Sequence, residues 1–234
     1  MEIQVGVAKV GKYAVRDSGD SVEVVERPNG GLSVIIVDGQ GHGKSAKRIS
    51  HQIATKAASL ISDGTRDGVV MRSISDFLYA LRGGSVSATV TILTADLAAN
   101  SLIISRNSNT PVVINHQDGS SCISSGVNPI GVHRINRPSV SQWPLYPDTT
   151  VIGFTDGVIH AGRGYNRKGF SLDYVTDLLA VETPEPQWLA NLLLEHAIGL
   201  SQGRPEDDMA VAVLGIRDVD NLLGKRSISI RYPF

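Results

Sequence analysis

The spacing of apolar residues indicates strands over the first forty residues of the chain. Residues 3–10, "IQVGVAKV", are rich in residues that favour β-structure. Residues 21–39, "SVEVVERPNGGLSVIIVDG", contain two apolar runs separated by Pro, Asn and two glycines at 28–31. Because this composition is typical of a tight turn, we expect two strands joined at residues 28–31.

The period of the apolar residues then lengthens to that of a helix. Apolar side chains recur three or four residues apart over residues 49–61, and again over residues 70–81. This spacing predicts one helix from about 44 to 61 and a second that ends at Gly83 and Gly84.

Strand patterns return in the second half of the chain. Residues 87–124 predict a meander of three strands that turns near 98–100 and at 117–119. Two further strands are expected at "SVSQWPLY" (139–146) and "TTVIGFTDG" (149–157), and another at "MAVAVLGI" (209–216). Helices are predicted near 171–181 and 186–200, the second introduced by Pro184 and Pro186, which suit a first helical turn.

The order of these elements favours one fold class. Strands and helices occur in clusters and do not alternate, so the pattern predicts an α+β layered fold with antiparallel sheets. No repeat, low-complexity run or linker interrupts it, so we expect a single domain over residues 1–234 with a core at about 5–215. The extension 216–234 contains one further possible strand, at 227–231, with no assigned role.

Composition narrows the functional classes. Charged residues make up 19% and hydrophobic ones 41%, and 22 Lys plus Arg against 23 Asp plus Glu give a net charge of −1. This balance offers no large basic field for nucleic acid or for an anionic membrane. The N-terminus lacks a signal-peptide pattern, and no run reaches the roughly 18–20 apolar residues of a membrane helix. The lone Cys122 excludes an internal disulfide and is read as a small core residue, so we expect a cytoplasmic protein.

The stretch "SVIIVDGQGHGKSAKRIS", residues 33–50, allows two interpretations. A strand, a glycine-rich turn and Gly-Lys-Ser before a helix are the outline of a nucleotide-binding P-loop. That pattern, aligned on residues 43–45, requires glycine at position 38, where this chain has Asp38. Its carboxylate would repel the phosphates that a P-loop binds, and Lys44 would then be a solvated side chain. The stretch therefore fits better a loop that places an aspartate on a metal ion.

Other acidic residues support the metal interpretation. Four acidic positions stand where predicted strands begin or end: Asp20, Asp38 before Gly39, Asp156 before Gly157, and the pair Asp207 and Asp208. Glycine after an aspartate lets the backbone turn sharply and leaves its carbonyl accessible. Hard oxygen ligands of this kind suit Mg²⁺ or Mn²⁺, and no histidine pair has the spacing of zinc ligands.

These motifs resemble a known family in their order and spacing. "SGDS" (18–21), "VDGQGHG" (37–43), "FTDGV" (154–158) and "EDDMAVAV" (206–213) are similar to the motifs of metal-dependent protein phosphatases related to protein phosphatase 2C. The nearest branch is the bacterial one of stage II sporulation protein E and the stress-response sigma-factor phosphatases. The resemblance spans about residues 5–215. It implies two stacked antiparallel β-sheets flanked by α-helices, with two Mn²⁺ or Mg²⁺ ions at one edge.

The resemblance also implies roles for individual residues. Asp38 would bridge both ions, the carbonyl of Gly39 and Asp20 would complete one site, and Asp156 with Asp207 would hold the other. Water activated between the two ions would attack the phosphorus of phosphoserine or phosphothreonine. Neighbours on an extended segment point to opposite sides, so only one aspartate of the 207–208 pair should be a ligand, and the family pattern favours Asp207 over Asp208.

Three positions concern the substrate phosphate and the general acid. Arg16, four residues before Asp20, is the candidate that binds the substrate phosphate through a bidentate fork. Gln40 replaces a histidine that eukaryotic relatives carry, and an amide cannot act as a general acid. His42 is the candidate substitute, with a turn residue that bonds the backbone as the alternative interpretation.

Three functions follow as hypotheses. The first is an active protein serine/threonine phosphatase whose target, by the branch, is a phosphorylated regulator of the anti-anti-sigma type. The second is a pseudophosphatase that acts as a binding module, which a metal-free purified protein would favour. The third is a P-loop nucleotide-binding protein, against which Asp38 argues.

Overall fold

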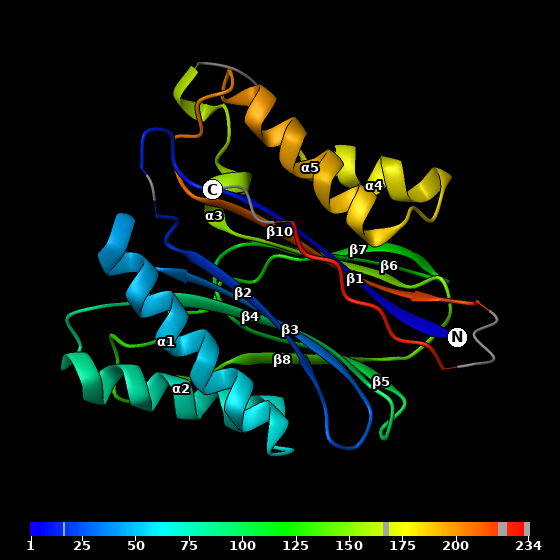
Figure 1. The fold of residues 1–234 in the computed structure, drawn as a ribbon, viewed down its shortest axis with the longest axis horizontal. Helices are drawn as coiled ribbons and strands as arrows, with labels where there is room; N and C mark the ends of the chain where they lie inside the picture. The colour runs from blue at the N-terminus through cyan, green and yellow to red at the C-terminus, as the bar shows by residue number, and fades with distance from the viewer. Residues whose placement is uncertain (16, 166–168, 220–223, 232–234) are drawn as a thin grey trace.

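The computed structural model describes residues 1–15, 17–165, 169–219 and 224–231. Two five-stranded sheets lie face to face, and every paired strand in them is antiparallel (Figure 1). The first sheet has the spatial order β1 (Glu2–Val10), β10 (Met209–Arg217), β9 (Thr150–Phe154), β6 (Val112–His116), β7 (Gly119–Ile123). The second has the order β2 (Asp20–Glu26), β3 (Gly31–Gly39), β4 (Ala88–Asp96), β5 (Ser101–Asn107), β8 (Ser139–Pro144). The α+β class with two antiparallel sheets is thereby confirmed.

Helices cover the outer face of each sheet. α1 (Gly43–Ser62) and α2 (Asp67–Arg82) pack on the sheet that contains β3, and α4 (Leu172–Val181) and α5 (Pro186–Leu200) pack on the sheet that contains β10 (Figure 1). A short α3 (Asp156–Ile159) and a 3₁₀ turn (Arg163–Tyr165) follow β9. The result is four layers: helices, sheet, sheet, helices.

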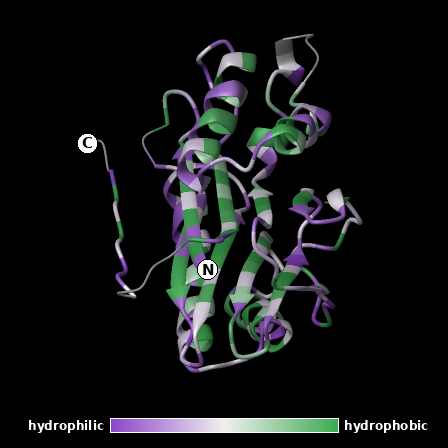
Figure 2. Ribbon diagram, turned by 90° about the vertical axis from the view of Figure 1, so that its right-hand side faces the viewer, coloured by the Kyte–Doolittle hydropathy of each residue, from purple (hydrophilic) through white to green (hydrophobic). Residues whose placement is uncertain are grey.

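Three apolar cores separate these layers, and alternation along the strands explains how one strand serves two of them. On β3, Val34 and Ile36 pack between the sheets, whereas Ile35 and Val37 pack against α1 and α2. Successive side chains of a strand point to opposite faces, so a strand buried on both faces is apolar at every position. Figure 2 shows the apolar residues concentrated on the strands and on the helix sides that face them.

The predicted three-strand meander at 87–124 is wrong. This region forms four strands, β4 and β5 in one sheet and β6 and β7 in the other. The chain changes sheet at 108–111, where the sequence pattern looked continuous. The buried guanidinium of Arg106 stabilises the crossing by donating to the carbonyls of Ile123, Ser108 and Thr110 at 2.9, 3.1 and 2.7 Å.

Two smaller expectations also fail. Cys122 is exposed, because it lies on β7 at the edge of its sheet and not in a core. Residues 227–231 are in no strand: the backbone of residues 224–231 runs beside the two sheets in Figure 2, with an ion pair from Arg226 to Glu26 of β2, and Ile228 and Ile230 are 87% and 82% exposed. Their apolar–polar alternation therefore has no core to face. Among the described residues, no helix has the length and apolar character to cross a membrane.

Candidate active site

The predicted acidic residues gather where the core between the sheets ends. In both sheets, alternate residues of a strand face that core, as Val5 and Val7 do on β1 and Val34 and Ile36 do on β3. Two residues further along, the same alternation brings Lys9 and Asp38 to the end of the inter-sheet space. We call this end, with Lys9, Asp20, Asp38 and Thr155 around it, the sandwich mouth.

Asp20 and Asp38 lie directly opposite each other at the sandwich mouth. Asp20 is the first residue of β2 and pairs with Asp38, the last but one residue of β3. Burial, and after it the charges of Asp20, Asp156, Asp207 and Asp208, raises the pKa of Asp38 to about 8. Burial likewise raises the pKa of Asp20 to about 7. Like charges placed opposite each other on neighbouring strands are destabilising, so this pair favours either protons or a cation.

A hydroxyl group between the sheets orients Asp20. Thr155, at the end of β9, donates through Oγ1 to Asp20 Oδ2 at 2.8 Å, and this bond lowers the pKa of Asp20 against the larger effect of burial. The same Oγ1 accepts from the backbone N–H of Ala210 at 2.8 Å. Thr155 and Asp20 are both almost completely buried. The hydrogen bond therefore joins the two sheets and leaves the other oxygen of Asp20 available to a ligand.

The glycines after Asp38 and Asp156 are required by close packing and not by a turn. Neither Gly39 nor Gly157 has a positive φ. A Cβ on Gly39 would lie 2.5 Å from the carbonyl oxygen of Ala46 in α1, and one on Gly157 would lie 2.1 Å from that of Asp208. The expectation that glycine is needed here for a sharp turn of the backbone is therefore wrong. Glycine is present because another backbone passes directly over it.

Asp156 and Asp207 approach the pair from the other sheet. Asp156 is the first residue of α3, and burial raises its pKa, with the charge of Asp207 the next cause. Asp207 lies in the loop before β10 and is exposed, and its Oδ1 accepts from the N–H of Asp208 at 2.9 Å. Both carboxylates are thus close enough to Asp38 for their charges to raise its pKa.

Asp208 has a different task from its neighbour. Its side chain is buried, and its two oxygens accept from the backbone N–H groups of Lys12 and Gly19 at 2.9 and 2.7 Å. These bonds tie the loop between β1 and β2 to the start of β10. Both oxygens are used by the protein, which leaves Asp207 as the member of the pair with an accessible carboxylate.

The Gly-His-Gly turn brings His42 to the start of α1. Gly41 and Gly43 have φ values of +94° and +68°, a region that favours glycine, and His42 between them is exposed. His42 is the N-cap residue of α1, yet its side chain makes no capping hydrogen bond. The alternative that His42 bonds the backbone of the turn is therefore not supported. Gln40 instead holds the end of β3, because its Oε1 accepts from the N–H of Ser87 at 2.8 Å.

Two lysines at the sandwich mouth were missed by the sequence reasoning. Lys9 Nζ and Lys47 Nζ each donate to the carbonyl oxygen of Asp20 at 3.3 Å. Much of the Lys9 side chain is exposed. Loss of hydration where the protein surrounds its amine nevertheless lowers the pKa of Lys9, and the charge of Lys47 also lowers it. The alternation on β1 is the signal that could have identified Lys9, since it follows Val5 and Val7 on the inner face.

The donor set fits divalent cations in its chemistry. It consists of carboxylate oxygens and a backbone carbonyl, which hard cations prefer, and burial with mutual repulsion raises the pKa of three of the carboxyls. Within the described ranges, however, no three His, Cys, Asp or Glu side chains converge closely enough to hold a metal ion as they stand. The repulsion between like charges opposes such convergence until a cation offsets it. Arg16, the candidate for the substrate phosphate, lies outside the described residues.

The surroundings of Lys44 do not support a P-loop. β3 and β4, the strands before α1 and after α2, are antiparallel neighbours. A P-loop belongs to a parallel strand–helix–strand unit. Lys44 is an exposed residue in the first turn of α1.

Comparison with known protein families identifies the family to which this chain belongs. The family model of stage II sporulation protein E (SpoIIE) matches residues 28–217, which is most of the chain. The chain belongs to the SpoIIE family. Stage II sporulation protein E of Priestia megaterium is 24% identical over 211 residues, and that of Bacillus subtilis (strain 168) is 24% identical over 214 residues. These alignments cover 90% and 92% of this chain but only 36% and 26% of the two relatives, so the chain spans between about a quarter and about a third of their length.

Solved structures of bacterial phosphatase domains have the same fold. The PP2C phosphatase domain of SpoIIE from Bacillus subtilis, solved with a fragment of its regulatory domain, superposes with a TM-score of 0.79 at 24% identity. That superposition covers 92% of this chain and 63% of the other. A serine/threonine phosphatase from Mycobacterium tuberculosis superposes with a TM-score of 0.70 at 15% identity, covering 93% and 100%. The predicted resemblance to the SpoIIE branch is confirmed by the family model, and the fold is that of the PP2C phosphatase domain.

Proposed function

We propose that this chain is a metal-dependent protein phosphatase that hydrolyses phosphoserine or phosphothreonine. The observation that carries the proposal is the direct pairing of Asp20 with Asp38 across β2 and β3, with Asp156 and Asp207 facing them from the other sheet. Membership of the SpoIIE family and the PP2C fold support the same conclusion.

Each residue of the site has a proposed role. Asp38 would contact both of two Mn²⁺ or Mg²⁺ ions, Asp20 and the Gly39 carbonyl would hold one, and Asp156 and Asp207 would hold the other. When bound, such ions supply Lewis acidity: they lower the pKa of a water molecule and offset the charge that develops on the phosphoryl oxygens. Thr155 keeps one oxygen of Asp20 turned toward β9, so that the other is presented in a fixed direction.

The remaining groups handle the substrate. Arg16 is proposed to grip the phosphate, and His42, exposed and without a capping bond, to protonate the leaving seryl oxygen. Lys9 and Lys47 place positive charge beside the acidic cluster, which favours the approach of a phosphate dianion that the carboxylates alone would repel.

We further propose that the substrate is a phosphorylated regulator of the anti-anti-sigma type and that the protein acts in the cytoplasm. The bacterial branch supports the substrate, as does the superposition on the structure of RsbU and RsbW domains from Mycobacterium tuberculosis, with a TM-score of 0.75. The exposed free thiol of Cys122 is compatible with a reducing compartment.

The decisive experiment combines metal supply with two substrates. Purified protein, stripped with EDTA, is assayed on an aryl phosphate and on a phosphoserine peptide, alone and with added Mn²⁺ or Mg²⁺. We expect no turnover without metal, recovery with either ion, and higher rates with Mn²⁺. Activity that survives thorough chelation would contradict the proposed two-metal mechanism.

A regulatory pseudophosphatase is the second candidate, and one observation favours it. The carboxylates in the described part of the chain do not form a closed ligand cluster as they stand. Calorimetric titration with Mn²⁺ separates the two candidates, because an enzyme must bind the ion at its acidic cluster whereas a binding module need not. Absence of Mn²⁺ binding, together with retained binding of a phosphoprotein, would favour the module.

A further inference from the structure

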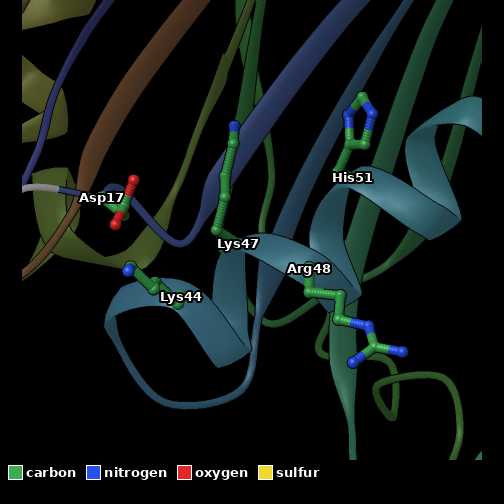
Figure 3. A pocket seen from close by; sticks show the side chains of 5 residues that line it. All are labelled: Asp17, Lys44, Lys47, Arg48 and His51. Carbon is green, nitrogen blue, oxygen red and sulfur yellow. The ribbon is translucent and has the colours of Figure 1, made fainter.

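A basic hollow lies against α1, directly beside the sandwich mouth. It measures about 380 Å³ and is lined by Asp17 from the loop before β2 and by Lys44, Lys47, Arg48 and His51 from α1 (Figure 3). None of these residues belongs to the proposed set of metal ligands. We call this feature the α1 hollow.

The lining of the α1 hollow is predominantly cationic. It has three permanent cations against the single carboxylate of Asp17, although the whole chain has a net charge of −1. In the part of the chain that the structure describes, no carboxylate lies within ion-pair distance of Lys44, Lys47 or Arg48. Cations left without acidic partners around a concave surface attract an anionic ligand.

The α1 hollow is continuous with the acidic site. Lys47 lines it and also donates to the Asp20 carbonyl at 3.3 Å and to Ser21 Oγ at 3.3 Å. Asp17 lies three residues before Asp20 in the same loop. A ligand anchored in the hollow would therefore extend toward the carboxylates where the phosphate is proposed to react.

The spacing of the basic residues suits an extended peptide. Figure 3 shows Lys47 and His51 rising from the same side of α1 and Lys44 directed toward Asp17, whereas Arg48 extends away from them. From Lys44 to His51 the helix rises about 10 Å, at ~1.5 Å per residue. An extended chain covers that distance in about three residues, at ~3.3 Å each.

We propose that the α1 hollow binds an acidic segment of the protein substrate, within a few residues of its phosphoserine or phosphothreonine. This inference rests on the proposed phosphatase function and adds a substrate preference to it. Carboxylate side chains spaced along an extended peptide would meet Lys44, Lys47 and His51 in turn, and Arg48 adds a further cation to the lining. The hollow selects the substrate, whereas the sandwich mouth performs the chemistry.

The test compares two synthetic phosphoserine peptides of equal length. One carries three Asp or Glu residues within four positions of the phosphoserine, on either side, and the other carries Gln at those positions. With Mn²⁺ at low salt, we expect kcat/KM of the wild type to favour the acidic peptide about tenfold, mostly through KM, because several exposed ion pairs form together. Added salt should reduce the preference, since it screens exposed charges.

Charge reversal in the α1 hollow tests whether its cations cause the preference for the acidic peptide. The variant Lys44→Glu/Arg48→Glu should lose or invert the peptide preference while aryl phosphate hydrolysis stays within about twofold of wild type, because that substrate has no flanking charge. Lys56→Glu, which changes another exposed cation of α1 outside the hollow, is the control and should keep the preference. An unchanged preference in the double variant, or the same loss in Lys56→Glu, would overturn the proposal.

A binding measurement separates this proposal from the catalytic one. If the wild type hydrolyses neither peptide, the phosphatase assignment fails, and fluorescence anisotropy of the labelled peptides still tests the α1 hollow. Tighter binding of the acidic peptide by wild type than by Lys44→Glu/Arg48→Glu supports an acidic docking site. Equal binding of acidic and neutral peptides, or binding of inorganic phosphate alone, overturns it.

Discussion

Thr155 Oγ1 donates a 2.8 Å hydrogen bond to Asp20 Oδ2, and this bond joins the end of β9 in one sheet to the start of β2 in the other. Both side chains are buried, and the same hydroxyl accepts the N–H of Ala210. The relationship determines which face of the Asp20 carboxylate is presented at the sandwich mouth.

The first prediction concerns this hydroxyl. Thr155→Val keeps the shape but leaves a buried carboxylate and a buried N–H without their partner, so we expect a loss of about 1–3 kcal/mol in the free energy of unfolding. Mn²⁺ should also bind more weakly, because Asp20 is free to rotate. Urea denaturation and Mn²⁺-dependent turnover measure the two effects. Thr155→Ser retains the hydroxyl and should recover most of both; equal behaviour of the Val and Ser variants would contradict the role of the hydrogen bond.

The second prediction contrasts Asp38 with Lys44. Asp38→Asn should lower activity by several orders of magnitude, because it removes the carboxylate proposed to contact both ions, whereas Lys44→Ala should stay within a few-fold of wild type on an aryl phosphate. The Asn variant should remain folded, and its melting temperature should respond less to added Mn²⁺, since stabilisation by a ligand follows its affinity. An inactive Lys44→Ala beside an active Asp38→Asn would reverse the assignment in favour of a P-loop.

The third prediction separates the adjacent aspartates by two different measurements. Asp207→Asn should abolish most activity with little change in stability, because its side chain is exposed. Asp208→Asn should cost about 1–3 kcal/mol of unfolding free energy, since an amide N–H₂ then faces one of two backbone donors. Thermal denaturation and the Mn²⁺-dependent rate are compared for both. A larger loss of activity in Asp208→Asn at a temperature where both variants are folded would show that Asp208 is the ligand.

The fourth prediction concerns pH in the absence of metal. Burial raises the pKa of Asp38 to about 8 and that of Asp20 to about 7, from the value of 3.8 that is ordinary for an aspartate. Between about pH 4 and pH 8 the folded protein therefore holds protons that the unfolded chain has released, and its stability falls as the pH rises through this window. Melting temperatures in EDTA from pH 5 to 9 measure the slope. Asp38→Asn should show a shallower decline, and a wild-type profile that is flat or rises with pH would contradict the raised pKa values.

The fifth prediction tests His42 as a general acid. Its replacement by alanine should slow hydrolysis of a phosphoserine peptide, whose leaving group needs a proton, far more than hydrolysis of an aryl phosphate, whose leaving group does not. Rates on both substrates are compared with Gln40→Ala, which removes only a tie to Ser87. Equal losses on the two substrates for His42→Ala would remove the general-acid role.

Much of this protein could be read from residue order, because the signals are local. The continuous apolar run of β3, the helical spacing of α1 and α2, and the glycines after α2 each depend on neighbours in the chain. The acidic residues at strand ends were recognised in the same way, since a strand that ends in an aspartate needs no tertiary information to be noticed. Their order along the chain also led correctly to the SpoIIE family and to the fold of its phosphatase domain.

Only the tertiary structure decided the relationships that join distant segments. The sequence pattern looked continuous across 108–111. The chain crosses between the sheets there, and the guanidinium of Arg106 donates to the carbonyls of Ser108 and Thr110, a contact that no local pattern predicts. The need for Gly39 and Gly157 comes from backbones that pass above them, and the division of tasks between Asp207 and Asp208 comes from a loop nearly two hundred residues away in sequence. Sequence determines which residues are available at the end of each strand, because propensity and alternation act over a few positions. The fold determines which of their oxygens and amines meet at the sandwich mouth, because those meetings depend on how two sheets are stacked.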